Sequence, residues 1–134
     1  MTAKFTPLQG GCLCGDVRFQ IKAPPIQSGY CHCRMCQRNS GAPAVASFSV
    51  LVHDFAYVAG RPAAFRSSAH GQREFCPRCG SYLVFRDDTP EIGVNTASLD
   101  DPGAVPPTFH IYWESHIDWF DTADTLPRYE KGLP

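Results

Sequence analysis

The chain has 134 residues, is 43% hydrophobic and 19% charged, and carries a formal net charge of −1. This length suits one folded domain spanning residues 1–134, and the hydrophobic content is too high for a disordered chain. The near balance of 12 basic and 13 acidic residues argues against nucleic-acid binding, which needs a basic surface. No apolar run approaches the roughly 20 residues of a membrane span, and the N-terminus lacks the apolar core of a secretory signal. We therefore expect a soluble, cytoplasmic protein with neither nucleic-acid nor membrane partners.

The predicted elements are mostly strands. Apolar Val17, Phe19 and Ile21 alternate with polar residues, which predicts a half-buried strand over 17–22. Further strands are expected, in chain order, at 44–50, 55–60, 81–85, 91–97 and 108–113. A short helical turn is predicted at 34–39, and residues 60–62 and 100–103 carry turn signals. The sequence thus predicts a small, mainly β domain.

The seven cysteines form three groups along the chain, namely Cys12 and Cys14, then Cys31, Cys33 and Cys36, then Cys76 and Cys79. An odd number would leave one cysteine over in a disulfide scaffold. In a reducing compartment thiols persist and bind metals instead of pairing. We therefore interpret the three groups as metal ligands.

The segment Cys76-Pro-Arg-Cys79-Gly80 has the form of a zinc knuckle. Proline fixes φ after the first cysteine, and glycine tolerates a left-handed conformation after the second. A knuckle supplies half of a tetrahedral site, and Cys12 and Cys14, flanked by glycines, would supply the other half. Three alternatives stay open: a pairing with the middle cysteine group, iron in place of zinc, and a redox role for a Cys-x-x-Cys pair.

If those four cysteines close one site, Cys31, Cys33 and Cys36 remain as three ligands with a fourth position open. That pattern is typical of catalytic zinc, whereas four protein ligands are typical of structural zinc. His32 is a candidate fourth ligand, but in an extended chain its side chain points away from the neighbouring sulfurs, which favours a supporting or surface role. Glu114 and His116 would share one strand face and either could cover the site. We interpret His53, His70, His110 and His116 as ordinary strand or loop histidines.

Taken together, GGCLCG, CHCRMC and FCPRCG resemble the glutathione-dependent formaldehyde-activating enzyme family, which also contains centromere protein V. The tail HIYWESHIDWFDTADTLPRYE is similar to the C-terminal pattern of that family, so the resemblance runs from about residue 10 to 130. It implies a β-tent fold of stacked antiparallel sheets and two zinc ions per chain. The structural zinc would be held by Cys12, Cys14, Cys76 and Cys79, and the catalytic zinc by Cys31, Cys33 and Cys36.

The resemblance also implies an activity, the joining of glutathione to formaldehyde, for which members are described as carbon–sulfur lyases. We therefore expect a zinc-dependent lyase that acts on a small thiol–aldehyde adduct such as S-hydroxymethylglutathione. Arg34 and Arg38 would then pair with carboxylates of the substrate; the alternative is that both are ordinary solvated arginines. The rival function is a zinc-stabilised binding module without turnover.

Overall fold

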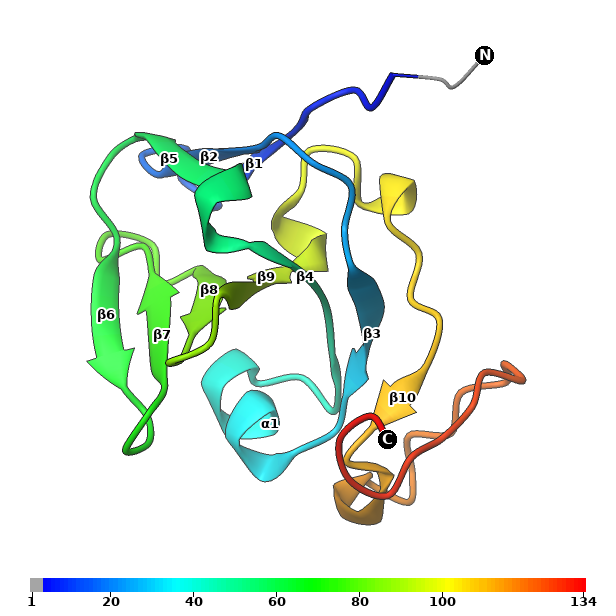
Figure 1. The fold of residues 1–134 in the computed structure, drawn as a ribbon. Coiled ribbons are helices and arrows are strands. Elements are labelled where there is room, and N and C mark those ends of the chain that lie inside the picture. Colours follow the sequence, from blue (N-terminus) through cyan, green and yellow to red (C-terminus); the bar gives the residue numbers. More distant parts are fainter. Residues whose placement is uncertain (1–3) are drawn as a thin grey trace.

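The computed structural model describes residues 4–134, which form two stacked β-sheets with one α-helix at their edge (Figure 1). The smaller sheet has the order β1-β2-β5, with bounds β1 (Leu8–Gly11), β2 (Arg18–Ile21) and β5 (Phe55–Ala59). The larger has the order β10-β3-β4-β9-β8-β7-β6, and its strands are β3 (Gln27–Cys31), β4 (Val45–Leu51), β6 (Ala63–Arg66), β7 (Gln72–Phe75), β8 (Tyr82–Arg86), β9 (Glu91–Asn95) and β10 (His110–Ile111). Among the described residues, all neighbouring strands are antiparallel except β3 and β10, which are parallel. The predicted mainly β fold of stacked sheets is confirmed.

The helices in the described part of the chain are short, and all but the last lie between strands. The α-helix α1 (Arg34–Ser40) follows β3, and the 3-10 helices are η1 (Val52–Asp54), η2 (Thr96–Ser98), η3 (Pro102–Ala104) and η4 (Trp113–Ser115). In Figure 1, α1 lies below the large sheet, and the C-terminal segment, in orange and red, runs beside β10. Within residues 4–134, no helix is long and apolar enough to cross a membrane.

The hydrophobic core lies between the two sheets. Phe19 and Ile21 of β2 and Phe55 of β5 are buried on one side, and Phe48 and Val50 of β4 belong to the same cluster. The rings of Phe19 and Phe55 stack with centroids 5.2 Å apart. Burial of each such side chain contributes roughly 1.5–3 kcal/mol to stability. The apolar residues that alternate along β2 and β4 therefore set which face of each sheet points inward.

Most of the predicted elements are present. Strands β2, β4, β5, β8 and β9 and the helix α1 correspond to predicted segments, with ends that shift by a few residues. The predicted strand at 108–113 is largely wrong, because β10 has only two residues and η4 begins at Trp113. Tyr112 ends the strand, since its φ of 54° is left-handed. Strands β1, β3, β6 and β7 are missing from the prediction.

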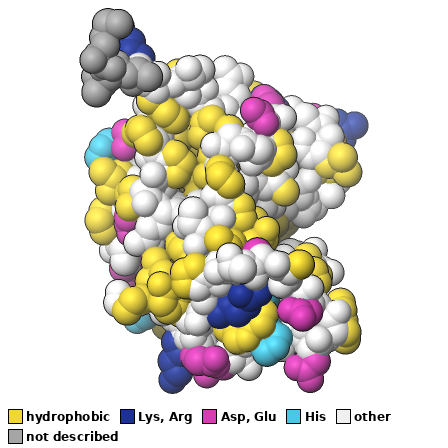
Figure 2. All heavy atoms as spheres, turned by 90° about the vertical axis from the view of Figure 1, so that its right-hand side faces the viewer, with side chains coloured by type: hydrophobic (Ala, Val, Ile, Leu, Met, Phe, Trp, Pro, Cys, Tyr) yellow, Lys and Arg dark blue, Asp and Glu magenta, His cyan; other side chains and the backbone are white. Residues whose placement is uncertain are grey.

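Hydrophobic and charged side chains are distributed unevenly on the face of the molecule shown in Figure 2. Hydrophobic side chains gather over its upper and middle parts, and basic and acidic side chains lie close to one another near its lower end. That lower end is at the height of β10 and the C-terminal segment in Figure 1.

Candidate metal centres and their pocket

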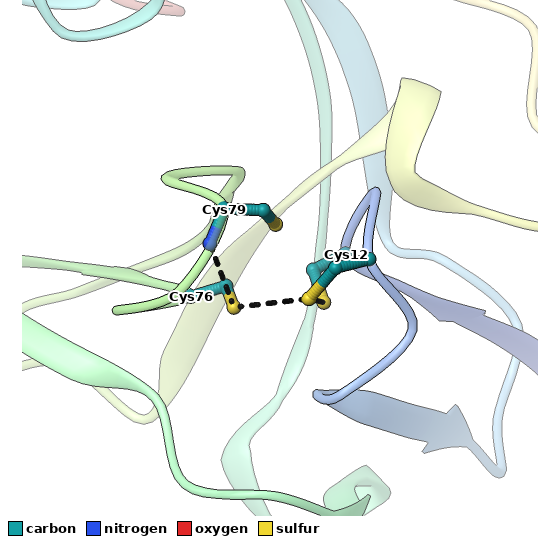
Figure 3. A group of neighbouring side chains, drawn as sticks. Cys12, Cys76 and Cys79 are labelled. Carbon is teal, nitrogen blue, oxygen red and sulfur yellow. Dashed lines mark hydrogen bonds between the residues drawn. The ribbon is translucent and has the colours of Figure 1, made fainter.

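Cys12, Cys14, Cys76 and Cys79 form a four-thiol cluster, whose Sγ atoms all lie within 4.8 Å of one another. The Sγ of Cys14 is 3.6 Å from that of Cys12 and 3.7 Å from that of Cys76. Four sulfurs around a zinc ion at about 2.3 Å would be about 3.8 Å apart along each edge of the tetrahedron. Figure 3 shows Cys12 on one turn facing Cys76 and Cys79 on another. The donor set and its spacing therefore fit a closed zinc site.

Tight turns aim these thiols at a common point. Gly15 and Gly80 follow the second cysteine of each pair and have φ values of 84° and 80°, which an L side chain rarely adopts. In the second turn, the Cys79 N–H donates to Cys76 Sγ at 3.5 Å (Figure 3). In the first turn, Cys12 Sγ accepts the N–H of Val17 at 3.2 Å. N–H groups directed at sulfur stabilise the thiolate form that binds a metal.

Cys31, Cys33 and Cys36 form a three-thiol cluster, which also lies within 4.8 Å. Cys31 is the last residue of β3, and Cys33 caps α1 by accepting the Cys36 N–H at 3.3 Å. Cys31 is buried and the other two are half-buried. Three thiols fit a metal ion that keeps one position for another ligand.

A pocket of about 340 Å³ opens beside the three-thiol cluster. It is lined by the three cysteines and by Met35, Ser47, Arg73, Tyr82, Phe85, Gly93, Ile111 and Tyr112. Burial raises the pKa of Tyr82 above its ordinary value, so that its hydroxyl stays neutral. Apart from the three cysteines, Arg73 is therefore the charged side chain among the described residues that line the pocket. The pocket is mostly apolar, and its size is in the range of sites for small molecules.

The strand register of the large sheet explains why there is space for a pocket at this position. Ser49, Gly93, Phe85 and Arg73 are successive cross-strand partners on β4, β9, β8 and β7. They share one face because side chains of paired residues point the same way. Residues on β4 alternate between large core side chains and small serines, and Gly93 adds no side chain at all. Gly93, and Ser47 on the same face of β4 as Ser49, line the pocket, and these small residues leave the space that Arg73 and Phe85 border.

His32 is buried behind the three-thiol cluster. Its ring is fully buried and does not belong to the cluster, and its Nε2 lies 2.8 Å from Nδ1 of His110. His110 Nε2 in turn lies 3.1 Å from Oδ1 of Asp124. Burial lowers the pKa of His32 to about 4, so its ring is neutral at pH 7. Burial acts to raise the pKa of Asp124, but hydrogen bonds from Thr122 and His110 prevail and lower it to about 2.

The His32–His110–Asp124 chain connects the cysteine loop to the C-terminal segment. Trp113 contacts both imidazole rings edge-on, at centroid distances of 4.8 and 5.3 Å. The Gln37 amide adds a second link, since Nε2 donates to the carbonyls of His32 and Ser115 at 2.8 and 3.1 Å. Three roles are considered for His32 from the sequence: fourth ligand, support and surface. Its ring lies outside the thiol cluster and is fully buried, which favours support.

Arg34 and Arg38 lie away from the three-thiol pocket. Both line a separate hollow together with Ile117 and Trp119, and Arg34 Nη1 donates to Gln37 Oε1 at 2.6 Å. Their role in substrate binding stays a prediction.

The strand face expected to carry Glu114 and His116 does not exist. Glu114 lies inside η4, and His116 follows it with its ring stacked on Trp113 at 4.0 Å. Neither residue lines the pocket beside the three thiols.

Two residues near the three-thiol cluster, Arg73 and His110, are not predicted from the sequence. Arg73 lies in the pocket, with Nη1 donating to Cys36 Sγ at 3.8 Å, and the sequence offers only its position three residues before the knuckle as a signal. The sequence indicates an ordinary strand histidine at His110, but its ring is fully buried and hydrogen-bonded to another histidine. Its partner His32 lies 78 residues away in the sequence, so no local pattern reveals the pair.

Comparisons with known proteins are consistent with the two cysteine clusters described above. A family model described as glutathione-dependent formaldehyde-activating enzyme matches residues 7–115. A Halomonas elongata protein named "Putative glutathione-dependent formaldehyde-activating enzyme" is 30% identical over 125 residues, which cover 85% of this chain and 80% of the relative. A crystal structure of a Rhodobacter sphaeroides protein matches with a TM-score of 0.60 at 24% identity, over 90% of this chain and 98% of that one, and supports the fold alone. The chain belongs to the glutathione-dependent formaldehyde-activating enzyme family.

Proposed function

We propose that this protein is a zinc-dependent carbon–sulfur lyase that acts on the adduct of a small thiol with an aldehyde. One observation carries the proposal: the three-thiol cluster borders a pocket of about 340 Å³, whereas the four thiols complete a tetrahedral set by themselves. A protein that used cysteines for stability alone would have no need of an incomplete set beside a pocket.

Two zinc ions fit the two donor sets. Cys12, Cys14, Cys76 and Cys79 would hold a structural ion, and Cys31, Cys33 and Cys36 would hold the second. With three protein ligands, a bound zinc ion supplies Lewis acidity, which polarises an aldehyde oxygen or lowers the pKa of a thiol.

The reaction needs the bond between carbon and sulfur to break and one proton to move. In the hydroxymethyl adduct R–S–CH₂–OH, the C–S bonding pair goes to sulfur, the O–H pair forms the C=O bond of formaldehyde, and the hydroxyl proton ends on the thiol. The reverse direction joins thiol and aldehyde. Apolar side chains of Met35, Phe85 and Ile111 would contact such an adduct and limit its exposure to water. The cap at Cys33 orders the loop that carries the thiols.

The Halomonas relative's name refers to glutathione and formaldehyde, so this pair is the first to test. Protein that carries two zinc ions by native mass spectrometry is mixed with both compounds, and adduct formation and breakdown are followed by proton NMR exchange measurements. We expect faster exchange than in buffer, and exchange at the buffer rate with a Cys36→Ser variant. If doubly loaded protein leaves the rate unchanged for glutathione and for simpler thiols, a zinc-stabilised binding module is the better description.

A further inference from the structure

Arg73 is a buried cation in the three-thiol pocket, and it has no carboxylate partner in the described part of the chain. Its side chain is on β7 and only 5% of the residue is exposed. None of the ion pairs among residues 4–134 includes it. The guanidinium lies over the rings of Phe85 and Tyr82, with Cζ 5.1 and 5.9 Å from their centroids. Nε is buried and has no hydrogen-bond partner among the residues that the structure describes. Burying such a group is costly unless a ligand uses it.

Glu74, the next residue on β7, is a buried charge that does have partners within the protein. Glu74 points to the opposite face of β7, where it accepts hydrogen bonds from Arg86 Nε at 2.6 Å and from the Tyr57 hydroxyl at 2.7 Å. The two adjacent buried charges therefore differ in how many partners they have within the protein. Glu74 is fully engaged within the protein, whereas Arg73 has one contact with a thiol and faces the pocket.

The contact with Cys36 uses only part of the hydrogen-bonding capacity of the Arg73 guanidinium. Three thiolates around one divalent ion leave one net negative charge, which Arg73 would offset through the Nη1 contact to Cys36 Sγ at 3.8 Å. A guanidinium has five N–H donors, however, and those not used by sulfur can hold an oxyanion in a fork. Among residues 4–134, the pocket lining contains no second basic side chain and no carboxylate.

We propose that Arg73 binds an anionic group of the substrate, and that the pocket selects a thiol, or its aldehyde adduct, with an apolar body and a single carboxylate. This inference rests on the proposed function for the presence of a thiol substrate. Met35, Phe85, Ile111 and Tyr112 would contact the apolar body. Glutathione carries two carboxylates and an ammonium group, of which only one carboxylate finds a charged partner among the lining residues, so it would be the weaker ligand.

Binding of matched thiols to zinc-loaded protein tests the proposal without any turnover. The probes are 4-(mercaptomethyl)benzoate, benzyl mercaptan, which has the same body without the carboxylate, and glutathione, each titrated calorimetrically. We expect the carboxylated thiol to bind about tenfold or more tightly than benzyl mercaptan, which is the effect of one shielded charge-assisted hydrogen bond. It should also bind more tightly than glutathione. Equal affinity of the two benzyl compounds for the wild-type protein would overturn the proposal before any variant is made.

Variants then assign the preference to a residue. Arg73→Gln should reduce the ratio of the two affinities to about one while leaving benzyl mercaptan binding and zinc content close to wild type. Arg73→Lys keeps the charge and should retain part of the ratio, which also covers the case in which Arg73→Gln does not fold. Arg66→Gln, which removes an exposed arginine of the adjacent strand β6, is the matched control and should change nothing.

Two results would contradict this assignment. Loss of zinc from the three-thiol cluster in Arg73→Gln, with both benzyl compounds weakened equally, would show that Arg73 serves the cysteines alone. Loss of the preference in an Arg34→Ala, Arg38→Ala double variant, with Arg73→Gln retaining it, would place the anion site in the other hollow. If the carboxylate preference depends on Arg73 but no thiol shows catalysed exchange by NMR, the binding site stands and the lyase function fails.

Discussion

The two cysteine clusters use the same side chain but connect the chain in different ways. The four-thiol cluster joins turns that are 62 residues apart, between Cys14 and Cys76, and its thiols complete a tetrahedral set. The three-thiol cluster lies within residues 31–36, opens on a pocket, and is supported from behind by His32 and the C-terminal segment. A cluster that connects distant segments holds the fold together. A local cluster connects little chain, so it can leave a coordination position to a ligand.

The largest expected effect of this difference is on stability when one ligand is lost. Structural zinc contributes about 10–16 kcal/mol of apparent binding energy in small peptides, and a domain's net stability is about 5–15 kcal/mol. Cys76→Ser should therefore be insoluble or largely unfolded. Cys36→Ser should stay folded, lose one zinc ion and lose activity. Thermal melts, zinc analysis and the NMR assay on both variants measure this, and equal destabilisation would mean that both clusters are structural.

Chelation should separate the clusters without a mutation. We expect native mass spectrometry to find two zinc ions in fresh protein, and a mild chelator to remove one rapidly, because a position not filled by the protein admits the chelator. The remaining ion should leave only under denaturing conditions. A single zinc ion in fully loaded protein, or loss of both ions at the same rate, would remove the distinction between a closed and an open site.

His110→Ala should weaken the support behind the three-thiol cluster. The substitution leaves Nε2 of fully buried His32 without its partner at 2.8 Å and removes a ring packed on Trp113. We expect a loss of about 2–4 kcal/mol, from an unsatisfied buried group and lost packing. Urea denaturation measures it, with His53→Ala, an exposed histidine, as the matched control.

The His110→Ala variant also tests whether the histidine pair supports the cysteine loop in particular or only the stability of the protein as a whole. Because His32 lies between Cys31 and Cys33, a loosened ring should speed the release of zinc from the three-thiol cluster to a chromophoric chelator. Zinc in the four-thiol cluster should be retained as in the wild type. Release at the wild-type rate from the three-thiol cluster would mean that the histidine pair stabilises the C-terminal segment only.

Features that depend on neighbouring residues could be predicted from the sequence, and features that depend on distant residues could not. Cysteine spacing and the glycines after each pair indicate the turns of the four-thiol cluster, since the geometry of a turn is local. Apolar alternation predicts β2 for the same reason. The short strands β1 and β3 contain glycine, which lowers strand propensity.

Arg73 and His110 could not be assigned because both depend on distant partners. A charged residue in a strand ordinarily indicates the solvent face, but the face that carries Arg73 is covered by the cysteine loop and borders the pocket. His110 meets His32 only because β10 pairs with β3 in parallel, at a separation of 78 residues. Register between distant strands is set by the packing of the whole sheet, which no short window of the sequence contains.

The smallest expected effect concerns the link between the two turns of the four-thiol cluster. Ser81 Oγ accepts the N–H of Leu13 at 2.9 Å and lies 3.2 Å from Cys79 Sγ, so it ties one turn to the other without being among the four thiols. Ser81→Ala removes this hydrogen bond and should cost about 1 kcal/mol. If the four-thiol cluster serves stability alone, as we propose, the rate of adduct exchange should not change. Urea denaturation and the NMR assay measure the two effects on the same sample. A stable variant with lower activity would show that the four-thiol cluster also influences the pocket, and the separation between the two clusters would then be incomplete.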